Sequence, residues 1–91
     1  MKIFEETSQN FTVHIYTNDH LPAHVHIFKG SKKAGRPSVK INIGNENTPP
    51  EVIKVDGMQR QDVKLAWRLV VQHQEMFLKR WLQIHGFPKL D

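Results

Sequence analysis

The spacing of the apolar residues changes once along the chain, near residue 58. Before this point, apolar and polar residues alternate in short runs, and alternation with a period of two is typical of strands with one buried face. From there to residue 85, apolar residues recur at intervals of three and four, which is typical of an amphipathic helix. The predicted strands are 11–17, 24–28, 38–43 and the shorter run 51–55.

These two patterns predict an α+β fold in a single domain, residues 1–91. We expect a three- to four-stranded antiparallel β-meander, packed on one face by a long C-terminal amphipathic helix over about 58–85, because that face would otherwise stay wet. The polar stretch 72–75 indicates where the helix would bend or split, and residues 1–5 are a candidate for a further edge strand. The expected core residues are Val13, Ile15, Val25, Ile27, Val39, Ile41, Trp67, Phe77 and Trp81.

Composition excludes several classes of protein and site. The 91 residues include no cysteine, which rules out a disulfide framework and a zinc site built on thiolates. No apolar run is long enough to span a membrane, and the stretch MKIFEETSQN lacks the apolar segment of a signal peptide, so we expect a cytoplasmic protein. A chain of this length has a thin core, and its net charge of +4 favours an acidic partner.

Three of the six histidines lie in the stretch NDHLPAHVHIF, residues 18–28. His24 and His26 are two positions apart on a predicted strand, so both side chains project from one face, about 6.5–7 Å apart. His20 lies in the connection before this strand, beside Asp19. The density of imidazoles makes this stretch the first candidate for a functional site.

Strand alternation predicts which side chains share the face of His24 and His26. If the first two strands pair as a hairpin, His14 and Tyr16 lie on this face, and Lys40 joins them from the third strand. A run without acidic residues, 28–40, follows the histidines and predicts a basic loop beside the same face. Its cations are Lys29, Lys32, Lys33, Arg36 and Lys40.

The residues alone leave three alternatives open for this face. His24 and His26 could bind a metal ion, with His20 or Asp19 completing the ligand set. The same face could cleave RNA without a metal, one histidine acting as base and another as acid, while Lys40 stabilises the charge on phosphorus. In the third alternative the histidines are ordinary polar residues on the wet side of a sheet.

The stretch YTNDHLPAHVHIF, residues 16–28, resembles the signature of a bacterial family, domain of unknown function 4160, whose usual run is aromatic-x-N-D-H-x-P-P-H-x-H. The chain departs from it at Ala23, where the family usually has a second proline. The resemblance implies a DhiT-type toxin of a type II toxin–antitoxin module, neutralised by a tightly bound partner protein. The matching residues are Asn18, Asp19, His20, Pro22, His24 and His26.

Taken together, the residues and the resemblance predict a toxin that acts on RNA or translation through a face rich in histidine and lysine, with an acidic antitoxin as its partner. The alternatives are a non-enzymatic binding module and an accessory, antitoxin-like protein that uses the same face as an interface. If the protein is an enzyme, we expect a metal-independent ribonuclease without a cofactor. The catalytic candidates are His20, His24, His26 and Lys40, and the substrate-binding candidates are Asp19, His14, Tyr16, Lys29, Lys32, Lys33 and Arg36.

Overall fold

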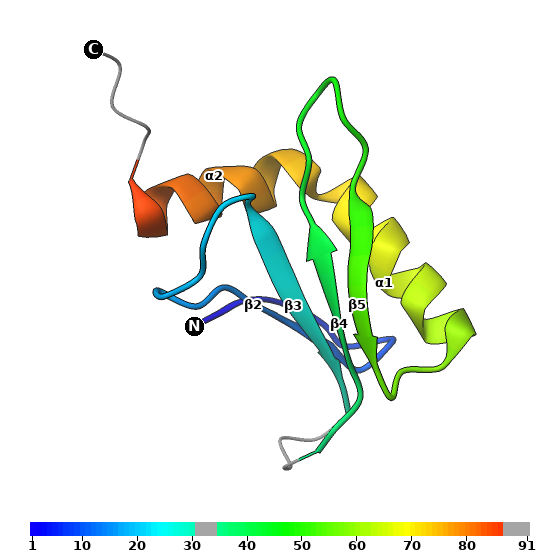
Figure 1. Ribbon diagram of the computed structural model, residues 1–91. Coiled ribbons are helices and arrows are strands. Elements are labelled where there is room, and N and C mark those ends of the chain that lie inside the picture. The colour runs from blue at the N-terminus through cyan, green and yellow to red at the C-terminus, as the bar shows by residue number, and fades with distance from the viewer. Residues whose placement is uncertain (31–34, 87–91) are drawn as a thin grey trace.

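The computed structural model describes residues 1–30 and 35–86, which form one open antiparallel sheet and two helices (Figure 1). The predicted α+β class is therefore confirmed. The strands are β1 (Lys2–Glu6), β2 (Phe11–His14), β3 (His24–Lys29), β4 (Ser38–Asn42) and β5 (Glu51–Asp56), and the helices are α1 (Arg60–Gln72) and α2 (Gln74–His85).

The sheet is a meander in which each strand pairs with the next, in the order β1-β2-β3-β4-β5. Its register places apolar residues opposite one another, as in the pairs Val13 with Ile27 and Val25 with Ile41. Both helices lie behind the sheet in Figure 1, with α1 beside β5. The helices therefore cover the apolar face of the sheet, as predicted for the C-terminal helical segment.

The expectation of three to four strands is too low, because the segment 1–5 pairs along β2 as strand β1. Phe4 lies opposite Val13, and its ring makes an edge-to-face contact with the buried ring of Phe77. Strand β2 ends at His14, earlier than the alternation over 11–17 predicts. The reason is local, since the amide of Tyr16 bonds to a side chain in the following turn and not to a neighbouring strand.

The prediction of one long helix is wrong, because the helical segment is divided into α1 and α2 at His73. The φ and ψ angles of His73, −117° and 22°, lie outside the helical range. The side chain of the next residue, Gln74, donates hydrogen bonds to the carbonyl oxygens of Ile43 (2.8 Å) and Thr48 (3.1 Å). These contacts anchor the break to the β4–β5 connection, and the break falls in the polar stretch 72–75.

The core lies between the sheet and the helices. Phe77 and Trp81 are buried as expected, whereas Trp67 is partly exposed and its indole N–H donates a hydrogen bond to the carbonyl oxygen of Pro50 over 2.8 Å. Among the described residues, neither helix has the length and apolar character needed to cross a membrane. The predicted strand residues are all buried: Val13, Ile15, Val25, Ile27, Val39 and Ile41.

Candidate functional site

The turn that follows β2 is closed by Asp19. The backbone N–H of Tyr16 donates a hydrogen bond to Asp19 Oδ2 over 2.9 Å, and the N–H of Asp19 donates to the carbonyl oxygen of Tyr16 over 3.0 Å. Aspartate commonly closes turns in this way, because its short side chain reaches nearby backbone groups. The turn leaves the second carboxylate oxygen, Oδ1, facing strand β3.

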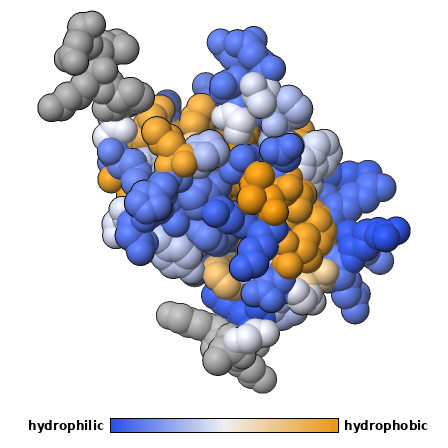
Figure 2. Space-filling view, viewed as in Figure 1, coloured by the Kyte–Doolittle hydropathy of each residue, from blue (hydrophilic) through white to orange (hydrophobic). Residues whose placement is uncertain are grey.

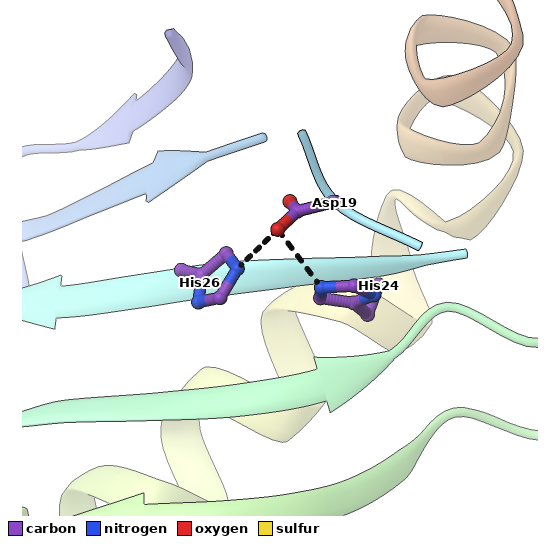
Figure 3. Close-up of side chains that lie close together, drawn as sticks. All are labelled: Asp19, His24 and His26. Carbon is purple, nitrogen blue, oxygen red and sulfur yellow. Dashed lines mark hydrogen bonds and ion pairs between the residues drawn. The ribbon is translucent and has the colours of Figure 1, made fainter. Parts of the chain in front are cut away.

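Two imidazoles of β3 meet this oxygen (Figure 3). Asp19 Oδ1 lies 3.3 Å from His26 Nε2 and 3.4 Å from His24 Nε2, and the three atoms lie within 4.8 Å of one another. We call this group the Asp19–His24–His26 cluster. The same-face placement of the two histidines agrees with the alternation, and their ring centroids are 5.0 Å apart.

His24 is the buried member of the cluster, with 4% of its surface exposed. Alternation predicts only that His24 lies on the polar face of its strand, and α2 brings the ring of Trp81 against it, with 5.2 Å between centroids. Its Nδ1 lies 2.9 Å from the carbonyl oxygen of Pro22, which can only accept, so Nδ1 carries the proton. In the neutral ring, Nε2 is then an acceptor with its lone pair near Asp19 Oδ1.

The cluster changes the acidity of its members. Burial acts to raise the pKa of the Asp19 carboxyl, but the hydrogen bonds from the Tyr16 amide and His26, with the charges of both imidazoles, outweigh it and lower that pKa below its usual value. Burial lowers the pKa of His26, and the opposing effect of Asp19 only partly offsets it. At neutral pH, Asp19 is therefore ionised and His26 is neutral.

An aromatic and cationic surface continues from the cluster across β2 and β3. The ring of Tyr16 lies 4.8 Å from that of His26, and His14 meets the ring of Phe28 edge-on at 5.1 Å. The guanidinium of Arg36 lies over Phe28, 4.3 Å from its centroid. This arrangement holds one cation and two aromatic rings beside the histidines.

His14 is the most strongly shifted imidazole of this surface. Burial lowers its pKa to about 4, and the nearby positive charges of Arg36, the amino terminus and Lys2 act in the same direction. Its Nε2 lies 3.1 Å from the hydroxyl oxygen of Thr12. His14 is therefore uncharged across the physiological range of pH.

A pocket of about 350 Å³ opens beside the cluster. His20, which is exposed, lines it together with Asp19, His24 and Lys40. Lys40 also lies opposite His26 in the register of β3 and β4. Of the four catalytic candidates that the sequence suggested, three therefore line this pocket, and the fourth, His26, lies beside it in the cluster.

One of the substrate-binding candidates, Lys29, lies elsewhere. The ammonium group of Lys29 donates a hydrogen bond to the carbonyl oxygen of Gln9 over 2.9 Å and lies 3.4 Å from Asp62 Oδ1 in α1, so it faces away from the pocket. Lys32 and Lys33 fall outside the described residues.

The pocket residues that were not among the candidates include Asn42 of β4 and Ile53 of β5. Alternation along β4 indicates the position of Asn42, two residues after Lys40. Ile53 could not be found in this way, because the β4–β5 register shifts at Lys40/Ile41 and breaks the alternation.

With the geometry in place, the chain can be compared with known proteins. The model of one family, described as Domain of unknown function (DUF4160), matches residues 10–82. The chain belongs to the DUF4160 family. This match contains the whole cluster and the pocket residues of the DUF4160 chain, and it confirms the resemblance seen in residues 16–28. No curated protein and no solved structure matches the chain.

Proposed function

We propose that this DUF4160 protein is a cytoplasmic toxin of a two-protein toxin–antitoxin module, and that it acts on RNA or translation through the face that carries the Asp19–His24–His26 cluster. The observation that carries the proposal is that His20, His24 and Lys40 line the same pocket. Imidazoles and a cation around one pocket suit the recognition of a phosphate-bearing substrate.

The surroundings of the pocket suit RNA in particular. Lys40 and Arg36 supply positive charge for backbone phosphates. Tyr16 and Phe28 supply aromatic rings beside these charges, and single-stranded bases stack on such rings. Whether RNA is cleaved or only bound depends on the catalytic candidates, which stay predictions.

The proposal is tested by growth after induced expression, combined with binding of a labelled single-stranded RNA. The informative variant is Arg36→Gln/Lys40→Gln, which removes two charges from the proposed surface. Lys64→Gln/Arg68→Gln is a matched control, because it removes two charges from exposed positions of α1. We expect arrest of growth by the wild type and the control, and loss of both arrest and RNA binding in the Arg36/Lys40 variant.

Two results would contradict this proposal. Growth without arrest under wild-type expression would remove the toxin role. Equal arrest by both double variants, with folding verified by circular dichroism, would remove the role of Arg36 and Lys40. If the Arg36/Lys40 variant no longer arrests growth but still binds RNA, cleavage of RNA becomes the activity to test. His26→Ala is then the next variant to measure.

The proposed partner is an acidic antitoxin, which a chain of net charge +4 would attract. The edge strand β5 offers it an interface, because Ile53 and Val55 are 46% and 47% exposed. Figure 2 shows an apolar patch where Figure 1 draws this strand. An edge strand also presents unpaired backbone groups that a partner strand can bond.

This interface can be tested by expressing the protein together with the product of the neighbouring gene. We expect the neighbouring gene product to restore growth of cells that express the wild-type toxin, and to fail with a Val55→Asp variant, which remains toxic because Val55 lies outside the pocket. Full rescue of that variant would exclude β5 as the interface.

A further inference from the structure

We infer that the Asp19–His24–His26 cluster binds a divalent first-row transition metal ion, with Zn²⁺ as the probe of choice. The ligands are one carboxylate oxygen and two imidazole nitrogens, a donor set that suits such ions. The inference goes beyond the proposed function, because metal binding does not require that the protein act on RNA.

The distances in the cluster match those of a metal site. With metal–ligand bonds of about 2.0–2.2 Å, two ligands at the tetrahedral angle lie about 3.3–3.5 Å apart. Asp19 Oδ1 lies 3.4 Å from His24 Nε2 and 3.3 Å from His26 Nε2, so two of the three edges already have this length. The third pair of atoms lies within 4.8 Å, and rotation of the half-buried ring of His26 would shorten it.

The hydrogen-bond roles also call for a positive centre. His24 donates a hydrogen bond from Nδ1 to the carbonyl oxygen of Pro22, so whenever the ring is neutral its Nε2 and Asp19 Oδ1 are two acceptors facing each other. A cation between them satisfies both. His26 joins the set when its neutral ring changes tautomer, so that Nδ1 carries the proton and the lone pair of Nε2 faces the ion.

Contacts outside the cluster hold the ligands in place. The Pro22 carbonyl fixes the tautomer and orientation of His24, and the Tyr16 amide holds the other oxygen of Asp19. Metal-binding histidines and carboxylates are commonly oriented by such outer contacts. Trp81 packs against His24 and limits movement of its ring. The cluster is therefore organised before any ion arrives.

Three protein ligands leave a coordination position for water or a substrate atom, as in catalytic zinc sites. The pocket lined by His20 and Lys40 lies beside the cluster and gives access to this position. A divalent ion with one carboxylate and a nearby lysine keeps a positive charge. The open position would therefore favour an oxygen anion as its ligand.

The experiment is a zinc titration of the full-length, chelator-treated protein in competition with a chromophoric chelator. Asp19→Asn and His26→Ala each remove one ligand, and Asn can still accept the Tyr16 amide. His14→Ala and His20→Ala are matched controls, since His14 lies opposite His26 in the sheet and His20 lines the adjoining pocket, while neither belongs to the cluster. His24 is left intact because its burial makes a folding defect an alternative explanation.

We expect one Zn²⁺ per wild-type chain and a loss of more than about tenfold in affinity for Asp19→Asn and His26→Ala. The two controls should bind as the wild type does, and zinc should raise the melting temperature of the wild type but not of Asp19→Asn. Absence of stoichiometric binding by the folded wild type would overturn the inference and leave a cluster that shares protons. Equal binding by all variants, or loss in His20→Ala but not in Asp19→Asn, would also overturn it.

Discussion

The imidazole of His24 packs against the indole of Trp81, with 5.2 Å between the ring centroids. Trp81 is 2% exposed and also stacks on His85 at 3.8 Å, so it belongs to the core. The contact connects the candidate site directly to the packing of α2. Substitution of a site histidine can therefore change stability as well as chemistry, and the two effects have to be separated.

We expect His24→Ala to lower the free energy of unfolding by about 2–3 kcal/mol, because it leaves a cavity against Trp81 and an unpaired Pro22 carbonyl. His20→Ala, at an exposed position, should change it by no more than about 0.5 kcal/mol. Urea denaturation followed by circular dichroism measures both values. Equal effects would mean that His24 contributes nothing to the core.

The stability of the protein should fall as the pH is lowered from about 7 to about 4, in part through His14. The folded-state pKa of His14 is about 4, below its ordinary value of 6.5, so in this window the unfolded chain takes up a proton that the folded chain does not. Protonation therefore favours unfolding, and the contribution of neutral His14 is complete only above about pH 6.5.

Melting temperatures across this window, for the wild type and His14→Gln, measure the effect. His26 also has a lowered pKa, but it titrates in both proteins and its contribution largely cancels. The wild type should lose more stability than the variant. Parallel curves would show that His14 keeps an ordinary pKa in the folded protein.

Two glycines with similar backbone angles should respond differently to alanine. Gly44 and Gly57 have φ angles of +71° and +74°, so alanine costs about 1 kcal/mol at either position through backbone strain. A Cβ at Gly57 meets nothing within 4 Å, whereas one at Gly44 collides with the carbonyl oxygens of Thr48 and Pro49. Gly44→Ala should therefore cost about 2–4 kcal/mol in all.

Chemical denaturation of the two variants tests this comparison, with each acting as the control for the other. A similar loss for both would mean that the connection between β4 and β5 adapts to the added methyl group.

If RNA binds as proposed, its affinity should depend on salt through a small number of phosphate contacts. Removing Lys40 or Arg36 should each reduce the slope of log affinity against log salt by about 0.7, the value for one contact to a single strand. Lys64→Gln should leave the slope unchanged. Fluorescence anisotropy at several salt concentrations measures it, and an unchanged slope in Lys40→Gln would place the phosphates elsewhere.

Alternation and one assumption about strand pairing were sufficient to predict much of the polar face. His14 does lie opposite His26, and Lys40 lies on the other side of His26. These relationships depend only on the period of a strand and on antiparallel pairing of neighbours, both of which are local. The recurrence of apolar residues at intervals of three and four likewise predicted that Phe77 and Trp81 lie in the core, where both are buried.

The details of the cluster depend on tertiary contacts that no local pattern contains. The rotation of Asp19 toward β3 follows from its bond to the Tyr16 amide, and the burial of His24 follows from the position of α2. That position is set by the break at His73, which Gln74 anchors to the β4–β5 connection. The polar stretch 72–75 predicted that the helix would be interrupted there, but it did not predict how α2 would be oriented after the break.

The two oxygens of Asp19 have different partners, since one accepts the Tyr16 amide and the other faces the histidines of β3. If the Asp19 carboxylate moves away from the turn, the Tyr16 amide loses its hydrogen bond and becomes exposed to solvent. If a ligand holds the carboxylate in place, the amide stays protected. The hydrogen-exchange rate of a single backbone proton, that of Tyr16, thus reports the local opening of the site without a probe attached to the site itself.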